Sequence, residues 1–186
     1  MKPIILVEGT IGVGKTTIAK QMLALRGNAE LYSIGQKIKD IVFELDLPYK
    51  RDVLQNTGDF FRTYDDLVWI NYLMKHINKQ KNVGAIIDDI RYSVESEYLK
   101  SKGFIIVRAK SEESLRKERI SSRDKISFSD ENWIDWNTHK NEHDTYSMEA
   151  DYEIPNNGSI EDLTKEIIKF FNSIEKRSRS LYDFLI

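Results

Sequence analysis

The amino-acid sequence predicts an α/β class protein, a three-layer P-loop NTPase fold in which helices cover both faces of a central parallel sheet. Three observations support this. Short, continuous apolar runs alternate with segments of helical periodicity, as in parallel sheets buried on both faces. A glycine-rich turn separates the first apolar run from the first helix. The 186 residues contain no internal repeat and no linker, so we expect a single domain, 1–186.

The N-terminal half begins with a buried strand over Pro3–Glu8, followed by a helix over Lys15–Arg26 that ends near Gly27. Ser33 is placed to cap the next helix. The further helices expected in this half are Gly35–Leu45, Lys50–Arg62 with an interruption at Gly58, and Tyr64–Lys79. Residues 35–80 therefore form a mainly helical insertion.

In the C-terminal half, apolar runs at 83–87 and 104–109 predict two more buried strands, and "DYEIP" predicts a short last one. The helices expected between and after them are Val94–Lys102, Ser111–Arg123 and Ser159–Ile174. Residues 124–150 are polar, and the tail 175–186 has no clear pattern.

Composition narrows the function. Lys and Arg number 28 against 30 Asp and Glu, a formal net charge of −2, so no basic field indicates nucleic acid or an anionic membrane as a partner. The absence of cysteine excludes disulfides and thiolate metal sites. The apolar run at residues 4–7 is too short for a signal peptide or a membrane span, so we expect a cytoplasmic protein, in the host cytoplasm if it is viral.

The turn after the first strand is a phosphate-binding loop of the Walker A type, Gly9-x-x-x-x-Gly14-Lys15-Thr16. Glycines let the backbone N–H groups approach phosphate oxygens, and the following helix adds its N-terminal dipole. Lys15 is expected to act in catalysis on the β- and γ-phosphates, and the Thr16 hydroxyl suits Mg²⁺. The expected cofactors are ATP and Mg²⁺, with ATP on Gly9, Thr10, Ile11, Gly12, Val13, Gly14, Lys15, Thr16 and Thr17.

Two features that the sequence lacks, a guanine-reading segment and the length of a motor ATPase, narrow the class of P-loop protein. A GTPase reads guanine with Asn-Lys-x-Asp, whereas the nearest segment here, 78–81, ends in lysine. Motor ATPases usually need a longer chain for their coupling elements. Small P-loop kinases, whose partners are small-molecule substrates, are therefore favoured.

A kinase also needs an acceptor site, and the segment "IIDDIRYSVESEYL" at 86–99 is the best candidate. Either Asp88 or Asp89 can orient Mg²⁺ or accept a proton, and we assign Asp88 to the metal and Asp89 to catalysis. Arg91 is suited to binding an acceptor phosphate in a fork. The alternative is an acidic helix cap beside a surface arginine.

In its segment order, the chain resembles the bacteriophage-type deoxynucleoside monophosphate kinases, a branch of the adenylate-kinase-like P-loop kinases. The resemblance is carried by the loop, by "RDVLQNTGDFFRTYDDLVW", by "DIRYSVE" and by "DYEIPNNGSIEDLTKEI". It implies that the insertion at 35–80 covers the acceptor nucleotide and that a lid lies at about 116–150. The acceptor-binding residues that it implies are Gln55, Arg62, Trp69, Asp89, Arg91 and Glu95. Trp69 also flanks the apolar stripe of its helix, a place suited to stacking on a base or sugar.

Arg116, Arg119 and Arg123 recur at helical spacing. Lid arginines near this position neutralise the transferring phosphoryl group in the family, so Arg119 and Arg123 are expected to be catalytic; a solvated face is the alternative. The family's lid motif is matched only loosely, by His143, Ser147 and Glu149. His139-x-x-Glu142-His143 also fits a zinc pattern but has no evident third ligand, so we reject a zinc peptidase.

The sequence therefore favours ATP-dependent phosphorylation of a (deoxy)nucleoside monophosphate to the diphosphate. Two alternatives stay open. One is a kinase for another phosphorylated metabolite, such as dephospho-coenzyme A or phosphomevalonate, and the other is a nucleotide-binding accessory protein without catalysis. A homodimer is also open, because nothing in the sequence sets the oligomeric state.

Overall fold

The computed structural model describes residues 4–80, 83–90, 92–125, 133 and 150–183. Its centre is a parallel sheet in the order β2-β3-β1-β4-β5. The strands are β1 Ile4–Glu8, β2 Ala29–Tyr32, β3 Gly84–Ile87, β4 Ile105–Lys110 and β5 Tyr152–Pro155. The P-loop NTPase-like α/β fold predicted from the sequence is confirmed.

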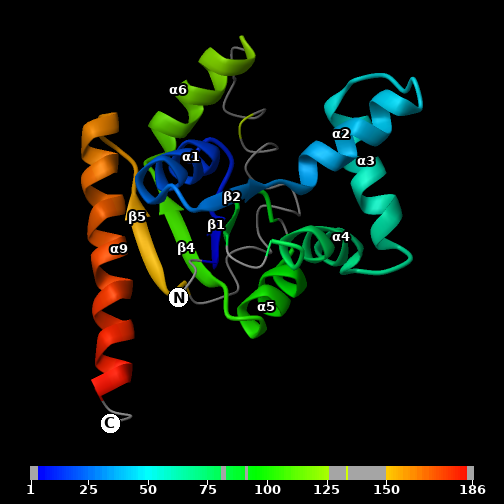
Figure 1. Cartoon of the computed structure of the whole chain (residues 1–186). Coiled ribbons are helices and arrows are strands. Elements are labelled where there is room, and N and C mark those ends of the chain that lie inside the picture. The colour runs from blue at the N-terminus through cyan, green and yellow to red at the C-terminus, as the bar shows by residue number, and fades with distance from the viewer. Residues whose placement is uncertain (1–3, 81–82, 91, 126–132, 134–149, 184–186) are drawn as a thin grey trace.

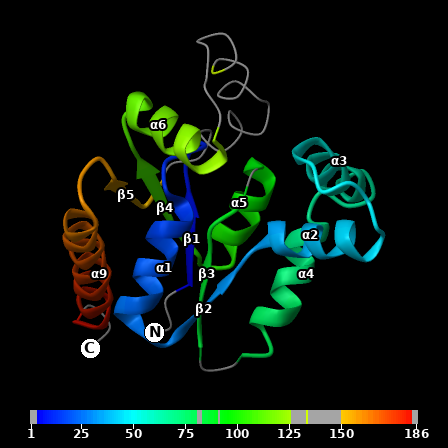
Figure 2. The same ribbon diagram turned by 90° about the horizontal axis from the view of Figure 1, so that it is seen from above.

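Helices cover both faces of the sheet, as Figure 2 shows from above. The helices are α1 Lys15–Arg26, α2 Ile34–Glu44, α3 Arg51–Arg62, α4 Val68–Ile77, α5 Ser93–Ser101, α6 Glu113–Asp124 and α9 Ile160–Asp183. On one face, residues of α1 and α9, such as Met22 and Phe170, form a core with the strands. On the other face, α2, α4 and α5 form a second core that includes Ile70 and Leu99. Burial of these two apolar faces accounts for the three layers.

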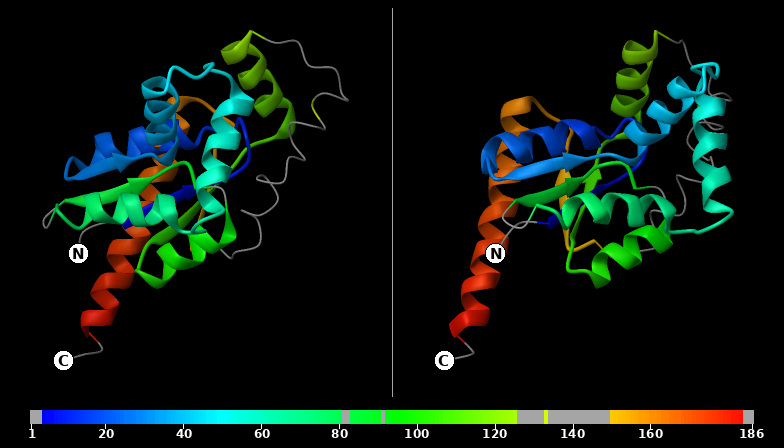
Figure 3. Two further views of the ribbon diagram at one scale, coloured as in Figure 1. Left: turned by 90° about the vertical axis from the view of Figure 1, so that its right-hand side faces the viewer. Right: turned by 45° about the vertical axis from the view of Figure 1, so that its right-hand side comes forward.

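Helices α2 and α3 stand away from the end of the sheet, and α4 returns to its face (Figures 1 and 3). The interruption expected at Gly58 is wrong, because α3 is continuous through it. Gly58 is buried where α2 and α3 pack closely, and a Cβ atom there would lie 3.0 Å from Ile38 Cδ1. Glycine at this position allows close helix packing and does not break the helix.

The C-terminal helix is longer than expected. The sequence predicted its end at Ile174, but α9 continues to Asp183 and includes most of the tail. No glycine or proline occurs after Gly158, so nothing in the chain interrupts the helix. An ion pair of 3.0 Å between Arg26 and Glu175 ties its middle to α1. No helix in the described part of the chain is long and apolar enough to cross a membrane.

Candidate active site

The phosphate loop lies between β1 and α1 and is supported from behind by two distant segments. Gly12 and Gly14 have φ angles of 77° and 93°, a left-handed backbone that favours glycine. A Cβ atom on Gly14 would lie 2.5 Å from the Nδ2 atom of Asn156, and one on Gly12 would lie 2.8 Å from the Arg116 carbonyl oxygen. Both the backbone conformation and the space therefore require glycine.

Two apolar side chains anchor the loop. Ile11 packs with Ile120 and Trp133 in a small separate cluster, and Val13 is buried in the main core. Their side chains face away from solvent, so these two residues can contact a nucleotide only through their backbone. These contacts pack the loop against the core, and its backbone N–H groups are the part suited to binding phosphate.

Lys15 folds back over this loop. Its ammonium group donates to the carbonyl oxygens of Gly9, at 2.6 Å, and Thr10, at 3.2 Å. The positive charge is therefore held close to the loop, where the sequence predicted the terminal phosphates of ATP to bind.

The predicted metal residues Thr16 and Asp88 lie together. Asp88 follows β3, is 4% exposed, and accepts a hydrogen bond from the side chain of Thr16. Burial is the largest influence on the Asp88 carboxyl group and raises its pKa, although the Thr16 hydrogen bond and the charge of Lys15 oppose that shift.

These two side chains fit Mg²⁺, which takes hard oxygen ligands and keeps several of its waters. No cluster of three or more His, Cys, Asp or Glu residues suited to a metal occurs among the described residues. Two oxygen donors are too few to complete the shell of Mg²⁺, so an ion bound here would also need water or phosphate ligands.

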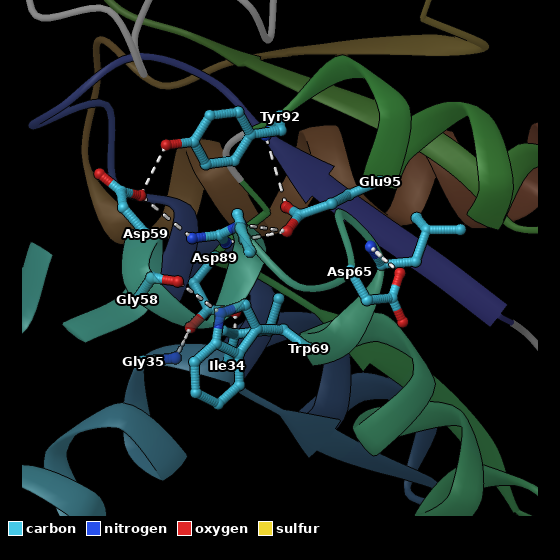
Figure 4. Close-up of polar contacts among 11 residues, drawn as sticks. Ile34, Gly35, Gly58, Asp59, Asp65, Trp69, Asp89, Tyr92 and Glu95 are labelled. Carbon is cyan, nitrogen blue, oxygen red and sulfur yellow. Dashed lines mark hydrogen bonds and ion pairs between the residues drawn. The ribbon is translucent and has the colours of Figure 1, made fainter. Parts of the chain in front are cut away.

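Asp89, the residue after Asp88, caps helix α2. Its carboxylate accepts from the Ser33 hydroxyl and the Gly35 N–H, each at 2.5 Å, and from the Ile34 N–H at 2.9 Å. The negative charge thus lies at the N-terminal end of the helix dipole. Figure 4 shows Asp89 next to Ile34 and Gly35. Asp89 therefore acts as a helix cap, the alternative given above, although the helix that it caps is more than fifty residues earlier in the chain. The catalytic role of Asp89 stays a prediction.

Ser33 is the N-cap of α2, as the sequence predicted, and accepts from the Gln36 N–H. We expect Ser33→Ala to destabilise the protein by about 1 kcal/mol, because it removes that cap and one donor to Asp89. Urea denaturation measures the change. Ser101→Ala removes an exposed serine at the end of α5 and is the matched control, expected to change stability by less than about 0.5 kcal/mol. Equal losses in the two variants would contradict the capping role.

A charged network joins α3 to the start of α5. The Nε and Nη2 atoms of Arg62 donate to Glu95 Oε1 at 2.9 and 2.8 Å, and Nη1 lies 3.4 Å from Asp59 Oδ1. The Tyr92 ring lies under the Arg62 guanidinium, 4.4 Å from its carbon to the ring centroid, and the Tyr92 hydroxyl donates to Asp59 at 2.7 Å. Burial and the hydrogen bond to Asp59 raise the pKa of Tyr92 to about 12. Asp59, Tyr92 and Glu95 face one another in Figure 4.

A cavity of about 160 Å³ lies between α2 and α3 next to this network. It brings together three of the predicted acceptor-binding residues, Gln55, Arg62 and Asp89. The other residues that line it are Ile34, Gly35, Ile38, Lys39, Arg51, Leu54, Gly58 and Asp59. The cavity therefore combines an apolar floor with several charged groups, which is typical of a small-molecule site.

Trp69 is not in this cavity. It is 4% exposed, packs edge-to-face on Phe61 at 5.4 Å, and its indole N–H donates to the Gly58 carbonyl oxygen at 3.0 Å. The flanking position expected for Trp69 is wrong, because the indole nitrogen finds its partner inside the core. Stacking on an acceptor has no support from this placement. Arg91 lies outside the described residues.

The three arginines of α6 have different surroundings. Arg116 is buried and donates to the Ile11 carbonyl oxygen at 3.3 Å, so it supports the phosphate loop. Arg119 donates to Ser111 Oγ at 3.1 Å and to the Asn156 carbonyl oxygen at 2.9 Å. Arg123 pairs with Asp124 through two contacts of 2.6 and 2.7 Å. A single solvated face is therefore excluded, and the catalytic roles of Arg119 and Arg123 stay predictions.

The end of α6 faces the start of α3. The hydrogen bond from Arg123 is the largest influence lowering the pKa of Asp124, and the charge of Arg51 in α3 lowers it further. The charge at the start of α3 therefore acts on the carboxylate at the end of α6. The lid motif residues His143, Ser147 and Glu149, and the zinc-like pair His139 and Glu142, lie outside the described residues.

Asn156 is a residue that sequence reasoning missed. Its Nδ2 atom donates to the Val13 carbonyl oxygen at 2.8 Å, and its carbonyl oxygen accepts from Arg119. It thereby connects the phosphate loop to α6. The available signal was its place directly after the last strand, at the edge where the phosphate loop also lies.

A family model described as an AAA domain matches residues 5–135, from β1 past the end of α6. The chain belongs to this AAA domain family. The match includes the phosphate loop, the α2–α4 insertion, both aspartates after β3 and the arginines of α6. No curated protein sequence matches the chain.

Solved structures show the same fold. A shikimate kinase from Acinetobacter baumannii in complex with shikimate is 19% identical, with a TM-score of 0.63 and 95% of each chain covered. A gluconokinase from Sinorhizobium meliloti is 13% identical, with a TM-score of 0.61 and coverage of 97% of this chain and 95% of that chain. The protein TT1252 from Thermus thermophilus is 15% identical, with a TM-score of 0.64, and 93% of this chain and 98% of that chain are covered.

Proposed function

We propose that this protein transfers the γ-phosphate of ATP to a (deoxy)nucleoside monophosphate and releases the diphosphate. The observation that carries this proposal is the pair Asp88 and Asp89. Asp88 contacts Thr16 of the phosphate loop, and the next residue, Asp89, lines the cavity between α2 and α3. A nucleotide-binding loop and a second small-molecule cavity therefore adjoin, as transfer between two substrates requires.

We assign a role to each residue, and its position supports that role. Backbone N–H groups of the loop and the Lys15 ammonium bind and orient the ATP phosphates. Thr16 and Asp88 would hold Mg²⁺, which would neutralise charge on those phosphates. Arg62 binds the anionic group of the acceptor, and Arg119 and Arg123 approach from α6. We place this activity in the cytoplasm, where ATP and Mg²⁺ are abundant.

A kinase for another small anionic metabolite is the second candidate. The structures with the same fold include a shikimate kinase and a gluconokinase, and the cavity is small, about 160 Å³. Both observations favour compact acceptors such as hydroxy acids. Dephospho-coenzyme A and phosphomevalonate, the alternatives from the sequence, are larger phosphorylated acceptors.

The deciding experiment follows ADP release with ATP, Mg²⁺ and one acceptor at a time. The panel contains the four deoxynucleoside monophosphates, the ribonucleoside monophosphates, shikimate, gluconate, dephospho-coenzyme A and phosphomevalonate. A deoxynucleoside diphosphate identified by chromatography supports the proposal, and turnover of only another acceptor replaces it with the second candidate. ATP binding without transfer to any acceptor would instead indicate a nucleotide-binding accessory protein.

A further inference from the structure

Two carboxylates contact the guanidinium of Arg62, and they are not equivalent. Glu95 is fully buried and takes two short bonds, 2.8 and 2.9 Å, through the Nη2 and Nε atoms. The side chain of Asp59 is 48% exposed, and its contact with Nη1 is 3.4 Å long. A buried ion pair with two short hydrogen bonds to one carboxylate oxygen holds its geometry far more strongly than a half-exposed single contact. Asp59 is therefore the carboxylate that can be displaced.

The contact with Asp59 is on the cavity side of Arg62. Arg62, Asp59 and Gly58 all line the cavity, and a Cβ atom built on Gly58 would lie 3.4 Å from Arg62 Nη1. Glu95 does not line the cavity. The Nη1 edge of the guanidinium thus faces the site, and the Nε–Nη2 edge faces the protein interior.

We propose that Glu95 is a positioning residue that aims Arg62 into the cavity, and that Asp59 is an internal competitor which an anionic acceptor displaces from Arg62. This inference rests on the proposed function and refines it. The resemblance implied that Glu95 binds the acceptor directly, but complete burial leaves it no surface for that contact. Lys39 and Arg51 add two more cations to the cavity lining. An anionic acceptor that takes the place of the Asp59 carboxylate would therefore lie among mainly positive side chains, which favours its binding.

Tyr92 stabilises the competitor. Its hydroxyl donates to Asp59 Oδ1, the same oxygen that contacts Arg62 Nη1, while its ring lies against the guanidinium. Tyr92→Phe removes the hydroxyl and keeps the ring. This variant therefore tests the hydrogen bond to Asp59 while leaving the packing of the ring against Arg62 in place.

The proposal predicts opposite effects for the two carboxylates. Asp59→Asn is expected to lower the acceptor KM about two- to fivefold, because it removes a half-exposed ion pair that competes with the acceptor for Arg62. Tyr92→Phe is expected to act in the same direction. Glu95→Gln is expected to raise the acceptor KM about tenfold or more, because the charge-assisted bonds that fix Arg62 are lost. The KM for ATP stays unchanged in all three variants, which general damage to the structure would not allow.

Asp66→Asn is the matched control, since it removes an exposed carboxylate just after α3, and it is expected to leave the acceptor KM unchanged. If Asp59→Asn and Glu95→Gln both lower the KM by the same factor, the carboxylates act only through their charge and the proposal is overturned. An unchanged or raised KM in Asp59→Asn overturns it as well. Because Asp59 is half-exposed, this outcome is readable even if Glu95→Gln fails to fold.

Calorimetric titration separates this inference from the proposed function. The probes are dTMP and inorganic phosphate, titrated into the wild-type protein and the Asp59→Asn and Asp66→Asn variants. If no monophosphate is phosphorylated, the proposed function fails, but tighter binding of inorganic phosphate by Asp59→Asn than by the other two proteins still supports the competitor. Wild-type protein and Asp59→Asn that bind both probes equally, or not at all, overturn it.

Discussion

Lys15→Ala is expected to lower kcat/KM for phosphoryl transfer at least about a thousandfold. The ammonium group is held over the loop by the Gly9 and Thr10 carbonyl oxygens, so it is already in place to meet phosphate oxygens when ATP binds. Alanine at this position leaves the α1 backbone intact, because alanine is the best helix former. The loss is therefore expected in chemistry and ATP affinity, while the thermal unfolding temperature changes little.

The control for this prediction is Lys20→Ala, which removes an exposed lysine from the same helix. Both variants lose one positive charge, but only Lys15 contacts the loop. ADP release at saturating acceptor, measured over a range of ATP concentrations, compares them. If Lys15→Ala turns over like Lys20→Ala, the loop does not serve phosphoryl transfer, and the proposed mechanism is wrong.

The phosphate loop and its flanking elements could be predicted because their signal is local. Gly9, Gly14, Lys15 and Thr16 follow a strand and open a helix, and the structure has that order. The strand Ala29–Tyr32 was not predicted, because four residues of mixed polarity carry no periodic signal. It forms through pairing with β3, more than fifty residues later in the chain.

The acceptor side was harder to predict because its contacts join distant residues. Trp69 is a core residue because the carbonyl group of Gly58, eleven positions earlier, accepts its N–H. Glu95 contacts Arg62 across 33 positions, and Asn156 reaches Val13 across 143. The sequence singled out Arg62 and Glu95 but not Asn156. It does not indicate which partner each of them meets.

Asp88→Asn is expected to lower phosphoryl transfer about a hundredfold or more while making the folded protein more stable near neutral pH. Asparagine still accepts the hydrogen bond from Thr16, but it supplies no charge for Mg²⁺ and none to balance Lys15. Stability rises because burial raises the pKa of Asp88, which means that the ionised carboxylate is disfavoured in the folded state. Each kcal/mol of that cost removed raises the unfolding temperature by about 2–4 °C.

The pH dependence separates this explanation from a general gain in stability. A group whose pKa is raised by folding stabilises the folded state in acid, and that contribution is lost as the pH rises through the folded pKa. The difference in unfolding temperature between Asp88→Asn and the wild type is therefore expected to be largest above that pKa and to disappear in acid, where Asp88 is protonated in both states. Asp66→Asn, which removes an exposed carboxylate, is expected to show no such difference at any pH. A stability gain for Asp88→Asn that is the same at every pH would contradict the burial of a charge as its cause, and full activity in this variant would remove Asp88 from the metal site.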